Sequence, residues 1–450
     1  MGMAVHPIDY RYGTDEMKAV WTEEHKLERM LDVEVALARA EEATGDVPEG
    51  TADAIADAAD EVALDRVKEI EAEIHHDVMA VVRAVQEQCP DEPHDFGEYV
   101  HFGATSNDVI DTADALRLRE ACDVVEAKLD ALVDALVAKA DEHKATTCVG
   151  RTHGQHGVPT TWGHKCAIWA SEVDRHRDRL DELRERLEVG QMSGAVGTQA
   201  SFGENAREIS RRTMEELDLA ESEISNQLVA RDRHAEYVGW LANVATTCDK
   251  IGINVRNMQR TEIAEVEEGF GESQVGSSTM PHKRNPIKSE NLCGLARVVR
   301  GFVRTELRNN TLWEERDLTN SSSERVVFAE ASVLTDHVLD YTVDVVEGLG
   351  FHDDAIRENL ELLDGVNMAE AVMMELARRG MGRQRAHERV RDAAMRAQQE
   401  DEAFGDVLLA DEAVAAELDE DEIEALVDPD EYLGTAVERV EAVVERLSGD

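Results

Sequence analysis

The sequence predicts an all-α protein built around a bundle of long helices. Five stretches without proline and poor in glycine carry apolar residues at intervals of three and four, which is the period of an amphipathic helix. They lie at about 107–143, 160–189, 234–268, 287–311 and 324–347. Only eight prolines and 4% aromatic residues in the 450-residue chain agree with a mostly helical composition. Helices of this length must bury broad apolar faces against neighbours, which indicates a bundle.

The first long helix is predicted to open at Asn107 and Asp108, both good N-cap residues. It runs for roughly 35 residues, or roughly 50 Å. Its apolar positions include Ile110, Leu116, Val124, Leu129, Leu132 and Leu136. The breaks between helices are short and rich in small or polar residues, at 101–108, 148–161, 188–205, 269–286 and 315–325. Loops on a rigid scaffold are common places for chemistry, so these breaks are the candidate site segments.

Three domains are predicted from these changes along the chain. An N-terminal helical domain covers 1–106, the central bundle covers 107–349 and contains the loop 269–286, and a C-terminal helical domain covers 350–450. The last fifty residues are acidic but keep an apolar period, which favours a folded helical end over a disordered tail. Their periodic positions are Val414, Leu418, Ile423, Leu426, Val437, Val440 and Val443.

The net charge of −50 is spread along the chain and is not confined to one tail. The sequence contains ten lysines, and none follows Lys288. Such a chain repels itself in dilute buffer, whereas molar salt shortens the screening length to about 3 Å. We therefore expect a protein adapted to a salt-loaded cytoplasm; an ordinary acidic protein is the alternative. Nucleic-acid binding is disfavoured because no basic face is available to neutralise phosphates.

The six cysteines are scattered without paired spacing, which is typical of free thiols in a reducing compartment. The first residues lack a basic segment followed by an apolar run, so no signal peptide is expected. No segment approaches the roughly 18 unbroken apolar residues of a membrane span. These features predict a cytoplasmic protein.

The strongest chemical signal is the segment from Gly276 to Pro286, with the sequence GSSTMPHKRNP. It resembles the signature loop of the fumarase/aspartase superfamily, whose members release fumarate by β-elimination. The resemblance implies that Ser277 is the catalytic base and that Lys283 also takes part in catalysis. It implies substrate contacts from Ser278, Arg284 and Asn285. A plain Gly/Ser turn would not explain a lysine and an asparagine placed together in so lysine-poor a chain.

The residue types suit this chemistry. Removing a proton from carbon beside a carboxylate places further negative charge on that carboxylate, and preorganised donors must meet the charge where it develops. Lys283 and Asn285 can supply such donors. A serine is a poor base at its ordinary pKa, so Ser277 would need nearby positive charge and exclusion of water by a closing loop. The residues alone do not say which hydroxyl acts.

A second loop reads Gly150-Arg151-Thr152-His153-Gly154-Gln155-His156. Histidine commonly donates a proton near neutral pH, and the leaving group in this reaction is a nitrogen. The family resemblance makes His153 the general acid, Thr152 a substrate contact and Glu290 the carboxylate that pairs with the histidine. His156 is expected to be structural.

A third loop, from His101 to Asp108, resembles the family loop whose Thr-Ser pair holds a substrate carboxylate. Thr105 and Ser106 precede the long helix, whose N-terminus favours an anion, and His101 is a further expected contact. A plain helix cap would explain Asn107 or Asp108 but not Thr105.

Other segments resemble the branch of the superfamily that cleaves succinylamino nucleotides. His75-His76-Asp77 resembles its Arg-His-Asp element, with His76 catalytic and His75 and Asp77 as contacts, although His75 replaces the usual arginine. Gly157 replaces a usual alanine. The segment 316–325 resembles the phosphate-binding element, and arginines suit a phosphate. The remaining expected contacts of this branch are Arg11, Tyr12, Gln227, Arg316, Ser321 and Arg325.

The resemblance covers roughly residues 10–330 and implies a three-domain fumarase/aspartase-like fold in a homotetramer with shared active sites. The expected reaction releases fumarate from N6-succinyl-AMP and from the succinylated aminoimidazole carboxamide ribotide of purine synthesis. No cofactor is expected. No metal is expected either, because adjacent His75 and His76 point about 100° apart on a helix and cannot chelate as an i, i+4 pair. The alternatives are a cycloisomerase of the superfamily, which would not need Arg316, Ser321 and Arg325, and an inactive structural homologue.

Overall fold

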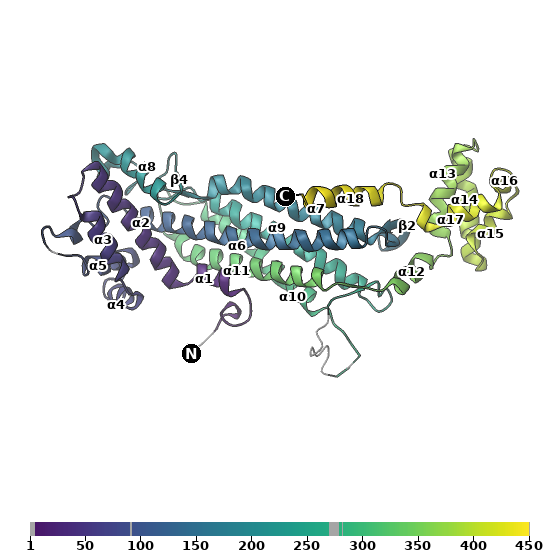
Figure 1. Cartoon of the computed structure of the whole chain (residues 1–450), viewed down its shortest axis with the longest axis horizontal. Helices are drawn as coiled ribbons and strands as arrows, with labels where there is room; N and C mark the ends of the chain where they lie inside the picture. The colour runs from purple at the N-terminus through teal and green to yellow at the C-terminus, as the bar shows by residue number, and fades with distance from the viewer. Residues whose placement is uncertain (1–4, 91, 270–278, 281, 450) are drawn as a thin grey trace. The chain divides into compact units, whose positions relative to one another are not determined.

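The computed structural model describes residues 5–90, 92–269, 279–280 and 282–449, and helices dominate it (Figure 1). The prediction of an all-α fold is confirmed. The α-helices are α1 (Asp15–Val20), α2 (Glu23–Thr44), α3 (Thr51–Asp60), α4 (Leu64–Ile74), α5 (Asp77–Gln86), α6 (Ser106–Glu142), α7 (Trp162–Leu187), α8 (Ala206–Glu216), α9 (Asp232–Met258), α10 (Ile287–Asn309), α11 (Thr319–Glu347), α12 (Asp353–Glu361), α13 (Ala369–Arg378), α14 (Arg383–Glu400), α15 (Phe404–Leu409), α16 (Glu412–Ala415), α17 (Glu420–Val427) and α18 (Ala436–Leu447).

Short strands form three two-stranded pairings among the described residues. Strands β1 (Thr147–Thr152) and β2 (Gln155–Thr161) form an antiparallel hairpin, β3 (Val189–Gly190) and β4 (Ala220–Glu221) pair in parallel, and β5 (Val266–Glu267) and β6 (Gly350–Phe351) pair antiparallel. Five 3-10 helices complete the described elements: Pro7–Asp9, Phe96–Tyr99, Ala200–Asn205, Val366–Met368 and Pro429–Glu431.

The five predicted long helices correspond to α6, α7, α9, α10 and α11, with one substantial difference. The helix expected over 234–268 ends ten residues early, at Met258. The chain then turns, Ala264 takes a left-handed conformation (φ 52°), and Val266 pairs with Phe351 in a short sheet. The apolar period of the sequence extends past Met258 because Val266, which fits that period, is buried in a strand. The start of α6 also moves by one residue, to Ser106.

The chain divides into two compact units. The first contains 1–129, 175–248 and 294–340, and the second contains 130–174, 249–293 and 341–450, so each long helix contributes to both. The three-domain division therefore stays a prediction.

Buried polar contacts join the long helices within the first unit. The hydroxyl groups of Tyr237 on α9 and Ser332 on α11 lie 2.7 Å apart. Between α7 and α9, the His176 ring nitrogen Nε2 lies 2.9 Å from Thr247 Oγ1. A buried polar group without a partner is costly, so each pair favours one register of the two helices it joins.

Each unit has its own apolar core. In the first unit, α2, α3, α5 and α8 pack against the start of α6, around residues such as Leu37, Ile55 and Val85. In the second unit, α13, α14, α15 and α17 enclose a smaller core around Phe404 and Leu408. The predicted folded end is confirmed in part by burial, since Val414, Leu418, Ile423 and Val440 are at most 2% exposed.

The six cysteines are free thiols, and all except Cys89 are buried. None of the described helices combines the length and apolar character needed to cross a membrane.

Candidate active site

His153 lies at the tip of the β1–β2 hairpin. Thr152 pairs with Gln155 across the ladder, so His153 and Gly154 are the two central residues of the turn. Both have positive φ, 54° and 75°, as a two-residue hairpin turn matching the strand twist requires. The turn leaves the imidazole and Thr152 exposed. The predicted acid is therefore exposed at the tip of the hairpin.

The base of this hairpin is fixed by a buried ion pair. Arg151 Nη2 donates to Glu265 Oε1 at 2.6 Å, and the Glu265 side chain is fully buried. Asn359 Nδ2 donates to the same oxygen at 3.2 Å. His156 is half-buried, and burial, aided by Arg151, lowers the pKa of its ring. A neutral, partly buried ring agrees with the structural role expected for His156.

The predicted signature loop is described only at its end. Ser277 and Ser278 lie outside the described residues. Lys283 and Arg284 are exposed, and Asn285 is half-buried. Arg284 Nη1 pairs with Glu267 Oε1 at 3.0 Å, which ties the end of the loop to strand β5.

The N-terminus of α10, which follows this loop, is capped from upstream by Glu268. One carboxylate oxygen of Glu268 accepts from the Lys288 N–H at 2.9 Å, and the other accepts from the Ser289 N–H at 2.8 Å and the Ser289 hydroxyl at 2.7 Å. A carboxylate at this place satisfies unpaired donors and complements the helix dipole. The cap fixes the exposed Glu290 in the first turn of α10. Among the described residues, no hydrogen bond or ion pair joins Glu290 to His153 of the same chain.

In the first unit, His75, His76 and Asp77 form the junction between α4 and α5. His75 ends α4 in the left-handed conformation (φ 56°), and His76 caps α5 by accepting from the Met79 N–H at 3.3 Å. Asp77 Oδ2 accepts from Arg325 Nη2 at 2.7 Å. Burial raises the pKa of Asp77, but the Val78 N–H and Arg325 outweigh it and hold that pKa below its usual value. The structure thus brings two predicted contacts together, Asp77 and Arg325.

The loop before α6 is organised by buried carboxylates. His101 Nδ1 lies 2.7 Å from Glu34 Oε1. Burial lowers the pKa of His101, and the charge and hydrogen bond of Glu34 more than reverse this, so that the pKa is raised. Asp108 accepts from the Thr105 N–H at 2.9 Å and from the Ser193 N–H at 2.7 Å. Asp108 is therefore the third residue of α6, and its carboxylate accepts from the N–H of Thr105, the residue before the helix. It is not the N-cap residue that the sequence indicated.

Three predicted nucleotide contacts, Arg316, Ser321 and Arg325, line one pocket of about 110 Å³ in the first unit. Its other walls come from the start of α2, from α6 and from α11. The full lining is Trp21, Glu23, Lys26, Asn107, Ile110, Asp114, Arg117, Arg231, Arg316, Asn320, Ser321, Glu324, Arg325, Phe328 and Ala329. Five cationic side chains face three carboxylates there, which favours an anion. Complete small-molecule sites usually enclose about 300–1,000 Å³, so this pocket fits one end of a nucleotide.

Gln227 orients one of the pocket arginines. Its amide Nε2 donates to the Ala195 carbonyl at 2.7 Å, and its Oε1 accepts from Arg316 Nη1 at 2.7 Å. Burial lowers the pKa of Arg316; Asp111 partly opposes this effect and nearby Arg231 adds to it, so the pKa remains lowered. Arg316 therefore gains from an additional anion.

The predicted contacts Arg11 and Tyr12 lie on a segment that packs along α11. Thr14 donates to Asp336 through its N–H at 3.1 Å and its hydroxyl at 2.7 Å. The Tyr12 ring lies 5.3 Å from the His337 ring, centroid to centroid. Neither Arg11 nor Tyr12 lines the small pocket.

Sequence reasoning missed Lys26, Asn107 and Arg231 as lining residues of the pocket. Lys26 carried a weak signal, as one of ten lysines in the chain. Asn107 was interpreted only as a helix cap, and Arg231, which directly precedes α9, belongs to the same Asn-Gln-x-x-x-Arg-Asp run as Gln227 but was given no role. Their convergence follows from the packing of α2, α6, α9 and α11.

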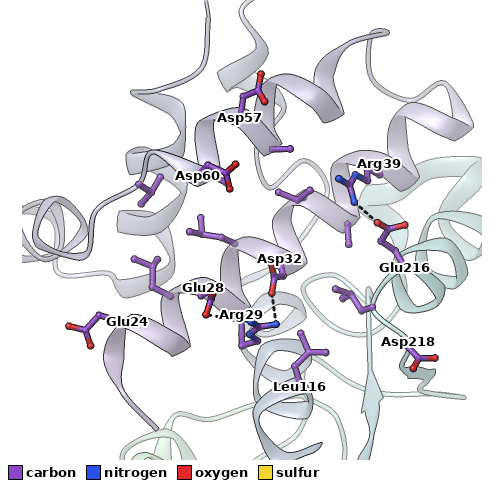
Figure 2. Close-up of a pocket in the computed structure, with 18 of the residues that line it drawn as sticks. Glu24, Glu28, Arg29, Asp32, Arg39, Asp57, Asp60, Leu116, Glu216 and Asp218 are labelled. Carbon is purple, nitrogen blue, oxygen red and sulfur yellow. Dashed lines mark hydrogen bonds and ion pairs between the residues drawn. The ribbon is translucent and has the colours of Figure 1, made fainter. Parts of the chain in front are cut away.

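A second, wider hollow of about 860 Å³ lies between α2, α3 and α8 (Figure 2). Seven carboxylates and three arginines line it, and ion pairs such as Arg39–Glu216 cross it. Its excess of negative charge would repel a nucleotide, and none of the predicted site residues lies there. Charge therefore favours the smaller pocket as the candidate site.

The chain matches a family model described as lyase over residues 9–301 and one described as adenylosuccinate lyase C-terminus over 365–443. It is 52% identical to the adenylosuccinate lyase of Methanocaldococcus jannaschii, covering 99% of this chain and 96% of that protein. It is 53% identical to the adenylosuccinate lyase of Pyrococcus horikoshii, covering 98% of each.

Solved structures with this fold include a fumarate lyase from Mesorhizobium sp. BNC1, with a TM-score of 0.88 and 32% identity over 97% of this chain and 98% of the other. The 3-carboxy-cis,cis-muconate lactonizing enzyme from Pseudomonas putida gives a TM-score of 0.89 and 35% identity over 98% and 99%. Fold and sequence together define a carbon–nitrogen lyase with a fumarase-like fold. The chain belongs to the adenylosuccinate lyase family.

Proposed function

We propose that the chain cleaves N6-succinyl-AMP to AMP and fumarate, and the succinylated aminoimidazole carboxamide ribotide to its carboxamide product and fumarate, with the site residues named above. The observation that carries the assignment is the convergence of Arg316, Ser321 and Arg325 on one cationic pocket. Both substrates end in a phosphate, which bidentate arginines bind well. Fumarate alone would leave these three residues without a role.

The proposed chemistry is a β-elimination. Ser277 takes the proton from the succinyl carbon next to the one that carries the nitrogen, the electron pair of that C–H bond forms the double bond of fumarate, and the C–N bond breaks. His153 gives a proton to the leaving nitrogen, and Glu290 supports its charge. Lys283 and Asn285 donate to the carboxylate on which negative charge develops. Thr105 and Ser106, at the N-terminus of α6, hold a substrate carboxylate.

We also propose a homotetramer in which neighbouring chains complete each site. Three features of the single chain support this proposal. His153 projects outward on its hairpin, Glu290 is exposed and does not contact it within the chain, and the phosphate pocket holds only part of a nucleotide. A second chain can supply the missing walls.

The activity is tested by incubating the protein with N6-succinyl-AMP in molar KCl, separating the nucleotides by chromatography and measuring fumarate. Equal amounts of AMP and fumarate are expected. A cycloisomerase is the rival with a specific observation in its favour, the 35% identity to the lactonizing enzyme. Absence of AMP formation, with turnover of a carboxymuconate, would establish that rival instead.

Shared sites are tested separately by mixing denatured Ser277→Ala and His153→Ala chains and refolding them in high salt. If each site takes one of these residues from each of two chains, about a quarter of randomly assembled sites contain both intact residues. Recovery of a sizeable part of that activity is expected. No recovery in verified mixed tetramers would mean that one chain supplies both residues.

A further inference from the structure

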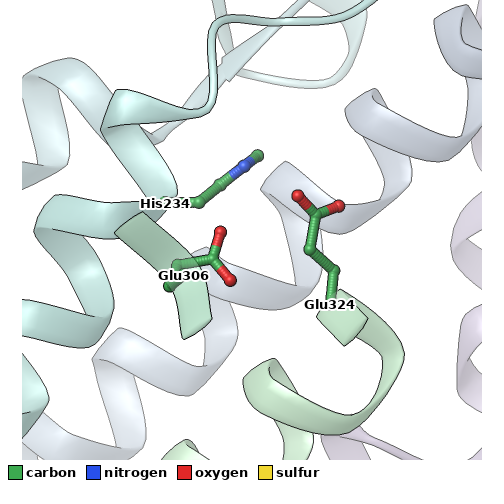
Figure 3. A group of neighbouring side chains, drawn as sticks. All are labelled: His234, Glu306 and Glu324. Atoms are coloured by element: carbon green, nitrogen blue, oxygen red, sulfur yellow. The ribbon is translucent and has the colours of Figure 1, made fainter. Parts of the chain in front are cut away.

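Three side chains from three long helices meet inside the first unit: His234 on α9, Glu306 on α10 and Glu324 on α11 (Figure 3). One potential ligand atom of each lies within 4.8 Å of those of the other two. The residues are 4%, 0% and 6% exposed. Metal sites in helical bundles are built in this way, from inward-pointing Glu and His residues on facing helices.

Each of the three side chains has a buried atom without a hydrogen-bond partner among the described residues. These atoms are His234 Nδ1, Glu306 Oε1 and Glu324 Oε1. The other carboxylate oxygens are occupied: Asn309 Nδ2 donates to Glu306 Oε2 and Asn320 Nδ2 to Glu324 Oε2, both at 2.9 Å. The amides therefore orient the carboxylates, while His234 Nδ1 and Glu306 Oε1 remain to be satisfied and Glu324 Oε1 has an ion-pair partner, Arg231, but no hydrogen bond.

The charges around the cluster are unbalanced. Arg231 binds Asp111 through two hydrogen bonds of 2.9 and 2.7 Å, and its Nε lies 3.1 Å from Glu324 Oε1. Arg316 also interacts electrostatically with Asp111. When Glu306 and Glu324 are ionised, three carboxylates (with Asp111) face two guanidinium groups, which leaves an excess of negative charge in a buried place. Uncompensated buried charge is strongly unfavourable, and one divalent cation would neutralise it.

We propose that His234, Glu306 and Glu324 bind a divalent transition-metal ion, of the kind that accepts mixed imidazole and carboxylate ligands, such as Zn²⁺ or Mn²⁺. Burial lowers the pKa of His234, and the neutral ring is the form that binds a metal. Zinc–ligand distances of about 2.0–2.2 Å require the three atoms to draw closer on binding.

The ion would have a structural role, because it would join α9, α10 and α11. Glu324 lies between Ser321 and Arg325 on α11 and itself lines the phosphate pocket. The metal would thus hold the pocket wall in place without taking part in the elimination. This inference does not depend on the substrate of the enzyme.

The alternative is that the two glutamates are simply protonated. Burial raises the pKa of both Glu306 and Glu324 to about 7, so near neutrality protons could remove part of the excess charge. Protonation would leave His234 Nδ1 without a partner unless a glutamic acid donated to it. Direct metal analysis separates the two possibilities.

The test is metal analysis of the full-length protein by mass spectrometry. The protein is treated with a chelator, exposed to Zn²⁺ or Mn²⁺, and dialysed in molar KCl, which screens weak binding by surface carboxylates. We expect about one ion per chain and a higher thermal midpoint than in the chelated protein. Cobalt(II) gives a second readout, because its visible absorption spectrum reports whether nitrogen and oxygen atoms bind the ion. This measurement uses the wild-type protein and therefore does not depend on the folding of any variant.

Loss of a residue that only hydrogen-bonds to a metal ligand lowers metal affinity by roughly 10–100-fold. Glu306→Gln and Glu324→Gln each remove a direct ligand, so each should lower the affinity by more than that. Glu41→Gln is the matched control: Glu41 is 1% exposed, has an unpartnered Oε2, and burial raises its pKa to about 9, but it lies outside the cluster. Its metal content should equal that of the wild type. Wild-type protein that binds neither Zn²⁺ nor Mn²⁺, or glutamine variants that keep the ion, would overturn the proposal.

Discussion

Replacing Arg316 with glutamine is the sharpest test of the phosphate pocket. Gln227 already orients the guanidinium through a 2.7 Å hydrogen bond, so little ordering remains when substrate binds. Burial lowers the pKa of Arg316 and Arg231 adds to this effect, so that the pKa stays below its usual value although Asp111 and Asp77 oppose the shift. The substitution should therefore remove one charge-assisted hydrogen bond, of about 1.5–3 kcal/mol.

That loss corresponds to a fall in kcat/KM of roughly 10- to 150-fold. The phosphate is remote from the C–N bond and is bound similarly in the ground and transition states, so most of the change should be in KM. Initial rates of fumarate release across a range of N6-succinyl-AMP concentrations measure both constants. Arg316→Lys should recover part of the loss, because lysine keeps the charge but not the bidentate geometry.

The control is Arg212→Gln, which removes an exposed arginine of α8 that pairs with Glu208. It should leave both constants unchanged. Thermal midpoints of the three variants verify folding. An Arg316→Gln enzyme with kcat/KM within twofold of the wild type would refute the assignment of a phosphate to this pocket.

Three other predictions follow from the site and from the charge. Ser277→Ala and His153→Ala should each reduce kcat by at least about a hundredfold while substrate still binds; near-full turnover of either variant would show the role to be misassigned. Lowering KCl from molar to millimolar should lower the thermal midpoint, because the 97 acidic side chains outnumber the 47 basic ones and the excess carboxylates then repel each other over a longer distance. A flat midpoint would argue against salt adaptation. Protonated His101 is stabilised by Glu34 in the folded state, so its pKa is raised and the pair stabilises the fold below about pH 6.5, the usual pKa of histidine. This contribution should disappear as the pH rises through the raised pKa. Glu34→Gln should weaken that pH dependence in thermal unfolding, and an unchanged profile would exclude the pair as its source.

The helical scaffold could be predicted from the sequence because its signal is local and repeated. The apolar period identified α6, α7, α10 and α11 to within a few residues, except that α11 begins five residues earlier than expected. The end of α9 could not be found in this way, because Val266 fits the same period although it is buried in a strand. The hairpin that carries His153 was also missed, since its strands are rich in glycine and polar residues and lack clear alternation.

The candidate site was predictable only where a motif was recognisable. Arg316, Ser321 and Arg325 belong to one segment and were identified together. Lys26 and Arg231, which line the same pocket, come from distant parts of the chain. The cluster of His234, Glu306 and Glu324 is still harder to predict, because its residues come together only through the packing of three helices.

The backbone at three candidate-site histidines limits how this enzyme can be stabilised. His75, His101 and His153 all have positive φ, between 54° and 63°, a conformation that costs most residues roughly 1–2 kcal/mol and glycine very little. A design procedure that ranks substitutions by backbone preference would therefore choose glycine at these positions. At His75 and His153 this change would exchange an imidazole for a small gain in stability, whereas at His101 it would also remove the partner of the buried Glu34. Variants selected for stability at His75 and His153 would therefore be among the least active.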